Sequence, residues 1–120
     1  MQVDGSAVTQ PVLLIGETKD AATPFEGSLE VRGRFPTASL IAGVGGTTHA
    51  ASLSGNACVD DAVAAYLSTG TVPARSPGRR ADKSCPPIPQ PNPTARISPG
   101  SSSGLSRAPR GLLPRSLRLR

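Results

Sequence analysis

The sequence predicts an α/β fold: a βαβ-α segment of a parallel sheet in residues 1 to 75, followed by a disordered basic tail in residues 76 to 120. Two short apolar runs, 11–16 and 38–44, have the composition of strands buried on both faces of a parallel sheet. A helix signal follows each run, as the alternation of strands and helices in such a fold requires. The charge changes sign after Arg75, which separates the two parts.

The first strand and the first helix are predicted from consecutive signals. Residues 11–16, Pro-Val-Leu-Leu-Ile-Gly, form a continuous apolar run rich in branched side chains, which is typical of a core strand. Thr23 then stands as a helix N-cap, with Pro24 at the first helical position and Glu26 placed to close a capping box. We expect the helix to continue to about Arg34.

The second strand and the second helix follow in the same order. Residues 38–44 are again apolar, and a glycine pair at 45–46 follows them. Strand, helix and strand therefore form one predicted βαβ unit with a right-handed crossover. Asn56 can cap the second helix and Gly70 can end it. Its apolar side chains recur at helical spacing: Val59, Val63, Tyr66 and Leu67. Residues 72–73, Val-Pro, are expected to close the folded part.

Two parallel strands make an incomplete sheet. A two-stranded sheet is marginal in water, and unpaired strand edges attract other strands. We therefore expect residues 1 to 75 to be the end of a larger α/β domain.

The tail carries the positive charge of the chain. Residues 1–75 hold 4 Lys/Arg and 7 Asp/Glu (net −3), whereas residues 76–120 hold 9 and 1 (net +8), which gives the overall +5. The tail also has no aromatic residue and is rich in proline, so it gains too little apolar burial to offset its ordering entropy. Its arginines suggest a polyanion-binding arm, although no aromatic is present for base stacking: Arg96, Arg107, Arg110, Arg115, Arg118 and Arg120.

Several classes of protein are not expected from this sequence. No apolar run approaches the 18 or so residues of a membrane helix, and residues 1–10 lack the pattern of a signal peptide, so the chain as written is expected in the cytoplasm. Cys58 and Cys85 are too few for a zinc site and do not form a CxxC motif, which leaves one disulfide or two free thiols. No metal and no organic cofactor are predicted.

An acid and a histidine follow the two predicted strands. Asp20 comes shortly after the first strand, and His49, the only histidine, comes after the second strand and its glycine turn. Functional groups of an open parallel sheet lie just past the carboxyl ends of its strands. The order acid then histidine matches the end of the series Ser…Asp…His in α/β-hydrolases, where the carboxylate orients the imidazole and the imidazole takes the serine proton.

The residues around this pair resemble a known family. The sequence is similar to the C-terminal region of the tripeptidyl-aminopeptidase-like α/β-hydrolases, which are mostly secreted serine exopeptidases related to prolyl aminopeptidases. The resemblance extends over about residues 10 to 75, and to Cys85 if a second cysteine is included. It rests on five ordered blocks: residues 11–16, 20–24, 45–49, 56–67 and 69–73.

The resemblance implies roles for four residues. Asp20 falls on the family's triad acid and His49 on its triad base. Cys58 falls on the cysteine that opens the last helix, and Cys85 resembles a second family cysteine after that helix, so the two form a candidate disulfide. The chain departs from the family at Thr48, where a glycine often precedes the histidine, and at position 21, where alanine replaces a common proline.

The resemblance also implies a serine that is missing ahead of Asp20. The family carries a Gly-x-Ser-x-Gly nucleophile elbow upstream of the acid, and no nucleophile elbow of this kind is identified anywhere in the chain. Removing the serine of a triad costs on the order of 10⁶ in kcat. We therefore expect a C-terminal hydrolase fragment that is inactive alone, whose complete parent would cleave peptides from a free N-terminus. The alternatives are a non-catalytic segment that pairs with an upstream hydrolase half, and a small polyanion-binding protein.

Overall fold

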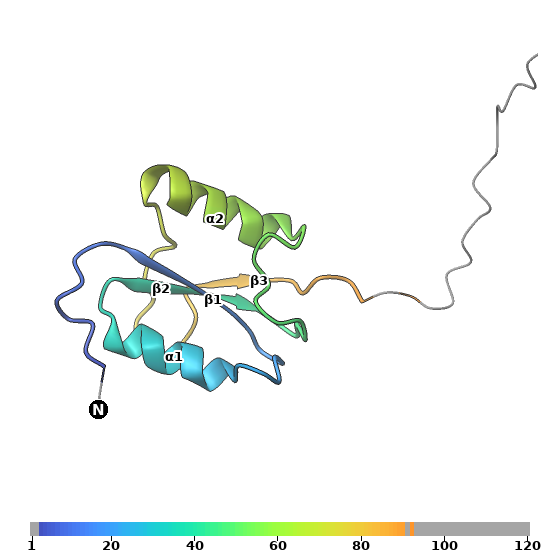
Figure 1. The fold of residues 1–120 in the computed structure, drawn as a ribbon, viewed down its shortest axis with the longest axis horizontal. Coiled ribbons are helices and arrows are strands. Elements are labelled where there is room, and N and C mark those ends of the chain that lie inside the picture. The colour runs from blue at the N-terminus through green and yellow to red at the C-terminus, as the bar shows by residue number, and fades with distance from the viewer. Residues whose placement is uncertain (1–2, 91, 93–120) are drawn as a thin grey trace, which may run out of the picture. The chain divides into compact units, whose positions relative to one another are not determined.

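The computed structural model describes residues 3 to 90 and residue 92, and the chain is seen as a ribbon in Figure 1. Three strands and two helices follow one another in this part of the chain. In order they are β1 (Val12–Glu17), α1 (Phe25–Arg34), β2 (Ala38–Gly43), α2 (Ala57–Thr69) and β3 (Lys83–Cys85). The predicted α/β class with a parallel sheet is confirmed.

The strands form one parallel sheet in the order β1-β2-β3. The register of β1 on β2 runs from Val12 opposite Ala38 to Glu17 opposite Gly43, and β3 pairs with the last three residues of β2. All six residues of β2 are buried, whereas those of β1 are half-buried up to Glu17. β1 is thus an edge strand within the described residues, while β2 lies at the centre.

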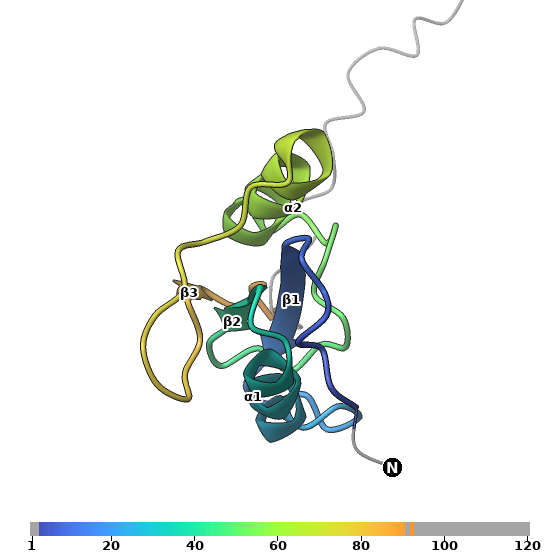
Figure 2. The ribbon, with the colours of Figure 1, turned by 90° about the vertical axis from the view of Figure 1, so that its left-hand side faces the viewer.

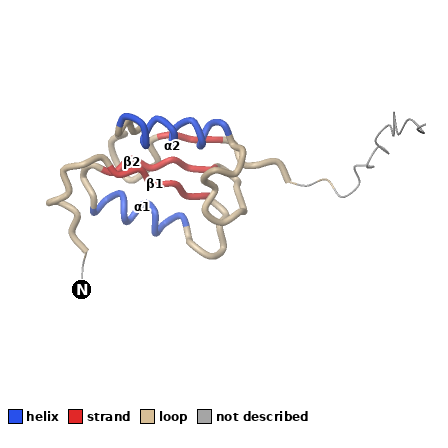
Figure 3. Tube along the Cα trace, turned by 45° about the horizontal axis from the view of Figure 1, so that its top comes forward, coloured by secondary structure: helices blue, strands red, loops and turns tan. Residues whose placement is uncertain are grey.

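The helices cover opposite faces of the sheet, with α1 on one side and α2 on the other (Figures 1 and 2). On the α2 side, Ile41, Val59 and Cys85 are fully buried and contact half-buried apolar side chains of β1 and α2. Successive strand residues point to opposite faces, so Leu40 points toward the α1 side, where Leu29 is buried. The three layers are visible along the Cα trace in Figure 3.

The first helix ends at Arg34 as predicted, but its predicted capping box is wrong. Pro24, not Thr23, is the N-cap residue, and no side chain caps the helix. The Thr23 hydroxyl instead donates a hydrogen bond to the carboxylate of Asp20. The Thr23 hydroxyl therefore bonds the candidate acid three residues before it and leaves the helix end without a side-chain cap.

The second helix begins after Asn56 and ends at Gly70, which has the left-handed φ of 71° that glycine tolerates. Both ends lie at the predicted residues, but the Asn56 side chain does not cap the helix and instead donates to the Pro86 carbonyl. Leu67, one of the four apolar residues at helical spacing, does not lie on the buried face, because it is 75% exposed. At about 100° per residue, Leu67 is turned about 80° away from Val59 and lies at the border of the packed face. Tyr66 lies closer to that face and donates its hydroxyl to the Pro11 carbonyl at 3.0 Å.

The ordered part of the chain does not close at residues 72–73 as predicted, since β3 follows at Lys83–Cys85. The reason is a long-range ion pair. The carboxylate of Asp82, just before β3, accepts hydrogen bonds from Nε and Nη2 of Arg32 in α1 at 2.7 Å each. Both side chains are almost fully buried. Residues 93–120 lie outside the described residues, so the predictions made for that part of the tail stay predictions.

The carboxylate of Asp82 also anchors the backbone on either side of it. It accepts hydrogen bonds from the backbone N–H of Leu40 at 2.8 Å and from that of Ser76 at 2.6 Å. Burial alone would raise the pKa of Asp82, but the hydrogen bonds from Arg32 and from the two backbone groups outweigh it and lower the pKa to about 2. Asp82 is therefore ionised at neutral pH and holds α1, β2 and the segment before β3 together.

Candidate active site

The candidate acid and base lie past the carboxyl ends of two neighbouring parallel strands. Asp20 follows the end of β1 at Glu17, and His49 follows the end of β2 at Gly43. Since these strands pair in register to their last residues, their exit loops leave the same edge of the sheet. This edge is where open α/β sheets carry their functional groups.

The structure brings the side chains of Asp20 and His49 into direct contact. Nδ1 of His49 lies 2.8 Å from Oδ2 of Asp20. The Asp20 side chain is only 5% exposed, whereas the imidazole is 60% exposed. A carboxylate at Nδ1 favours the tautomer with the proton on that nitrogen, which leaves Nε2 as a proton acceptor. The pair thus has the arrangement of an oriented general base.

Three donors besides His49 surround the carboxylate of Asp20. The Thr23 hydroxyl donates to Oδ2 at 2.5 Å, and the backbone N–H groups of Ala22 and Thr23 donate to Oδ1 at 2.8 and 3.2 Å. These bonds, that of the Thr23 hydroxyl first and that of His49 second, hold the pKa of Asp20 well below its usual range. The acid therefore stays ionised at every pH at which a histidine base works.

The variant Thr23→Val tests the hydrogen bond from the Thr23 hydroxyl to the Asp20 carboxylate. We expect the pKa of Asp20, followed by carboxyl NMR, to rise toward its ordinary value because the variant lacks the strongest donor. A carboxylate with a lowered folded-state pKa stabilises the fold above about pH 4, and this contribution is lost as the pH falls. The stability of the variant should therefore decline less between about pH 4 and pH 2. Thr71→Val, which removes a hydroxyl bonded to Thr69, is the matched control and should leave Asp20 unchanged.

Several hydrogen bonds join the two loops that carry the pair. The Thr18 N–H donates to the Gly43 carbonyl at 3.1 Å, and the Lys19 N–H donates to the Gly46 carbonyl at 2.9 Å. In the other direction, the N–H of Gly45 donates to the Thr18 hydroxyl at 2.7 Å. Gly45 has a φ of 82°, so the glycine pair allows the turn that these bonds need. Asp20 and His49 are therefore positioned by mutually bonded loops.

Thr18 and Thr23 were missed by the sequence analysis. Thr23 was assigned to a helix cap, which is the common role of threonine before Pro at a helix start. The sequence carries one usable signal: a hydroxyl three residues after a candidate acid can return to its carboxylate. Nothing in the sequence indicates that the Thr18 hydroxyl bonds a turn that follows another strand.

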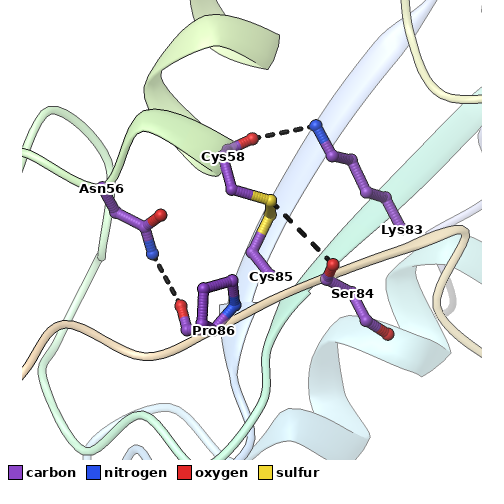
Figure 4. Close-up of a disulfide and its surroundings, with 6 residues drawn as sticks. All are labelled: Asn56, Cys58, Lys83, Ser84, Cys85 and Pro86. Carbon is purple, nitrogen blue, oxygen red and sulfur yellow. Dashed lines mark hydrogen bonds between the residues drawn. A yellow bond between two sulfur atoms is a disulfide. The ribbon is translucent and has the colours of Figure 1, made fainter.

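The two cysteines form a disulfide between α2 and β3 (Figure 4). Cys58 lies in the first turn of α2, Cys85 ends β3, and their Cα atoms are 5.7 Å apart. Lys83 donates Nζ to the Cys58 carbonyl at 2.9 Å, and the Asn56 amide donates to the Pro86 carbonyl at 2.7 Å. The disulfide thus strengthens the attachment of a three-residue strand.

A serine nucleophile is not found beside His49. Within residues 3–90, the hydrogen-bond partners of the ring are the Asp20 carboxylate and, at 3.5 Å, the Thr23 hydroxyl. The letters Gly-x-Ser-x-Gly do occur at 100–104, outside the described residues. That string follows the histidine instead of preceding the acid, and no strand-like apolar run leads into it, so it does not have the setting of a nucleophile elbow.

Two further kinds of feature are absent from the described ranges. None of the helices there is long and apolar enough to cross a membrane. The same part of the chain contains no group of three His, Cys, Asp or Glu side chains that would hold a metal ion.

Comparisons with known proteins agree with the geometry. A family described as "TAP-like protein" matches residues 1–85. The chain is 37% identical over 83 residues, 69% of its length, to a tripeptidyl aminopeptidase of Streptomyces lividans, of which this is 14%. It is 40% identical over 65 residues, 54% of its length, to carboxylesterase B of Mycobacterium tuberculosis, of which this is 12%. It is 33% identical over 63 residues, 52% of its length, to a serine protease of that organism, again 12% of the relative.

The chain spans about one seventh or less of these curated relatives. No solved structure matches it significantly. The family match covers well over half of the chain and includes all three strands, both helices and the Asp20–His49 pair. The chain belongs to the TAP-like family of α/β-hydrolases.

Proposed function

We propose that this chain supplies the acid and the base of a Ser–Asp–His triad in a TAP-like serine peptidase. The observation that carries the proposal is the 2.8 Å contact between Nδ1 of His49 and the largely covered carboxylate of Asp20. The serine comes from a part of the hydrolase outside these 120 residues. The chain alone is then a non-reactive component of the enzyme.

Each residue has a defined task in this proposal. Nε2 of His49 takes the proton of the serine hydroxyl as its oxygen attacks the scissile carbonyl, and the imidazolium then returns the proton to the leaving amine. Asp20 stays ionised, orients the ring and stabilises the imidazolium. Water, activated by the same nitrogen, then hydrolyses the acyl-enzyme. No metal ion and no organic cofactor take part in these steps.

The proposed substrates are peptides with a free N-terminus. The support is the similarity to the Streptomyces tripeptidyl aminopeptidases, whose name states this activity.

The edge strand β1 supports an attachment to the remainder of a hydrolase. Its outer edge carries no strand within the described residues. Beside it, a groove of about 390 Å³ lies between β1 and α1, with Leu14, Ile15, Pro24 and Val31 among its lining residues. We propose that an apolar strand of the serine-bearing part pairs with this edge and covers the groove.

A fluorophosphonate probe, which labels activated serines, tests the proposal. The chain is co-expressed with the part of the S. lividans tripeptidyl aminopeptidase that precedes its matched region. We expect no labelling of the chain alone, labelling of the upstream part in the mixture, and loss of this labelling with His49→Gln.

Two results would overturn this proposal. One is saturable labelling of the chain alone, with Ser102→Ala serving as the variant that tests the string at 100–104. The other is labelling of the upstream part that does not depend on His49.

The polyanion-binding alternative is not proposed. Its arginines from Arg96 onward lie outside the described residues, and no observation on the described part of the chain favours it.

A further inference from the structure

Glu17 is a buried acid that the proposed triad does not use. It is the last residue of β1 and is only 3% exposed. Within the described ranges its carboxyl group forms no ion pair, unlike the buried carboxylate of Asp82. A buried carboxyl group is costly unless hydrogen bonds compensate for its lost hydration. Its Oε2 receives such a bond from the hydroxyl of Thr48 at 2.9 Å.

The glycines at the exit of β2 leave the space that this carboxyl group occupies. A Cβ on Gly46 would lie 2.5 Å from Cδ and Oε1 of Glu17, closer than such atoms approach in proteins. A Cβ on Gly43 would lie 3.1 Å from Cγ. Glu17 therefore packs directly against the turn that leads from β2 to the histidine.

The bond to Thr48 attaches the residue immediately before the candidate base. One position earlier, the hydroxyl of Thr47 accepts a hydrogen bond from the Gln90 side-chain amide at 3.1 Å, but this contact does not involve β1. Past Gly46, the segment around His49 is therefore linked back by two contacts. The Thr48 hydroxyl bonds Glu17 at the end of β1, and the His49 ring bonds Asp20. Because the imidazole is 60% exposed, few other contacts fix its position.

We propose that Glu17 is a positioning residue for His49. Through the Thr48 hydroxyl it holds the segment around His49 against the end of β1, from which the loop with Asp20 leaves, so that Nδ1 stays within hydrogen-bond distance of the Asp20 carboxylate. The inference rests on the proposed function, in which His49 is the base. It adds a buried acid that acts on the base through a neighbouring side chain.

The ring nitrogens of His49 report this role directly. The chain has a single histidine, so ¹⁵N NMR of histidine-labelled protein gives one pair of ring signals. Above the pH at which the ring titrates, a ring held by Asp20 carries its proton on Nδ1, whereas a free imidazole prefers Nε2. We expect Glu17→Ala and Thr48→Val each to lower the Nδ1–H to Nε2–H ratio about fivefold, the effect of losing one ordinary hydrogen bond.

Two control variants separate positioning from general stability. Thr48→Ser keeps the hydroxyl and should keep the wild-type ratio. Val59→Ala removes buried volume on the α2 side of the sheet and should lower stability without changing the ratio in the folded protein. Thr48 is exposed, so its valine variant carries the test if Glu17→Ala fails to fold.

The outcomes distinguish this inference from the proposed function. A wild-type ring without a preference for Nδ1–H would contradict the Asp20–His49 pair itself. A wild-type ring with that preference, retained in both Glu17→Ala and Thr48→Val, would overturn the role of Glu17 alone. A ratio that falls in Thr48→Ser as much as in Thr48→Val would also overturn it, since the hydroxyl would then not be the cause.

Discussion

Asp82→Asn is expected to lower the free energy of unfolding by about 3–5 kcal/mol, the range for breaking a buried ion pair from one side. The guanidinium of Arg32 is 3% exposed and the carboxylate of Asp82 is fully covered. Asparagine offers Arg32 no negative charge, so the guanidinium would stay buried without a counter-ion. The variant also weakens the bonds to Leu40 and Ser76. We expect α1 and the segment before β3 to separate first.

Urea denaturation at neutral pH measures this effect. Glu30→Gln, which breaks an exposed pair with Arg34, is the matched control and should cost no more than about 0.5 kcal/mol. The ionised Asp82 stabilises the fold above about pH 4, and this contribution is lost as the pH falls toward its folded pKa of about 2. The difference in the free energy of unfolding between Asp82→Asn and the wild type should therefore become smaller over that range. A loss of stability at neutral pH no larger than that of Glu30→Gln would contradict this expectation.

Removing the disulfide is the second large effect that we expect. The bond closes a loop with a sequence separation of 27 residues. The chain-entropy description gives about 3.5 kcal/mol for such a loop, which is a large share of the stability of so small a core. Cys58→Ser combined with Cys85→Ser should lower the free energy of unfolding by about this amount, because the unfolded chain regains the freedom that the bond removes.

A reducing agent gives the matched comparison for the disulfide. Because these are the only cysteines, a thiol reductant should lower the stability of the wild type to that of the double variant and leave the variant unchanged. Equal stability of the oxidised and the reduced wild type would show that other contacts alone, such as Lys83 on the Cys58 carbonyl, hold β3 in place.

The elements that were predicted correctly depend on local signals. The strands at Val12–Glu17 and Ala38–Gly43 are continuous apolar runs, and Gly70 ends α2 because few other residues adopt its left-handed conformation. The short strand β3 has no such pattern. It depends on Arg32 meeting Asp82 across 50 residues of sequence, which neither composition nor periodicity reveals.

The candidate site shows the same division. Asp20 and His49 were identified from their order after two strands and from the family resemblance, and the structure places them in contact. Thr23 and Glu17 were not identified. The bond from Thr23 to Asp20 is local, but it competes with the helix-cap role that threonine commonly has at this position. The contact of Glu17 with Thr48 depends on how the end of β1 meets the loop after β2, and local propensity does not determine that approach.

A chimeric enzyme tests the proposal that Asp20 and His49 act as the acid and the base of a serine peptidase. Residues 3–90 of this chain replace the matched region of the S. lividans tripeptidyl aminopeptidase, which retains its own upstream serine. The measurement is kcat for release of N-terminal tripeptides. We expect an active chimera that loses on the order of 10⁶ in kcat with His49→Gln and on the order of 10⁴ with Asp20→Asn. A chimera whose activity survives His49→Gln would contradict it.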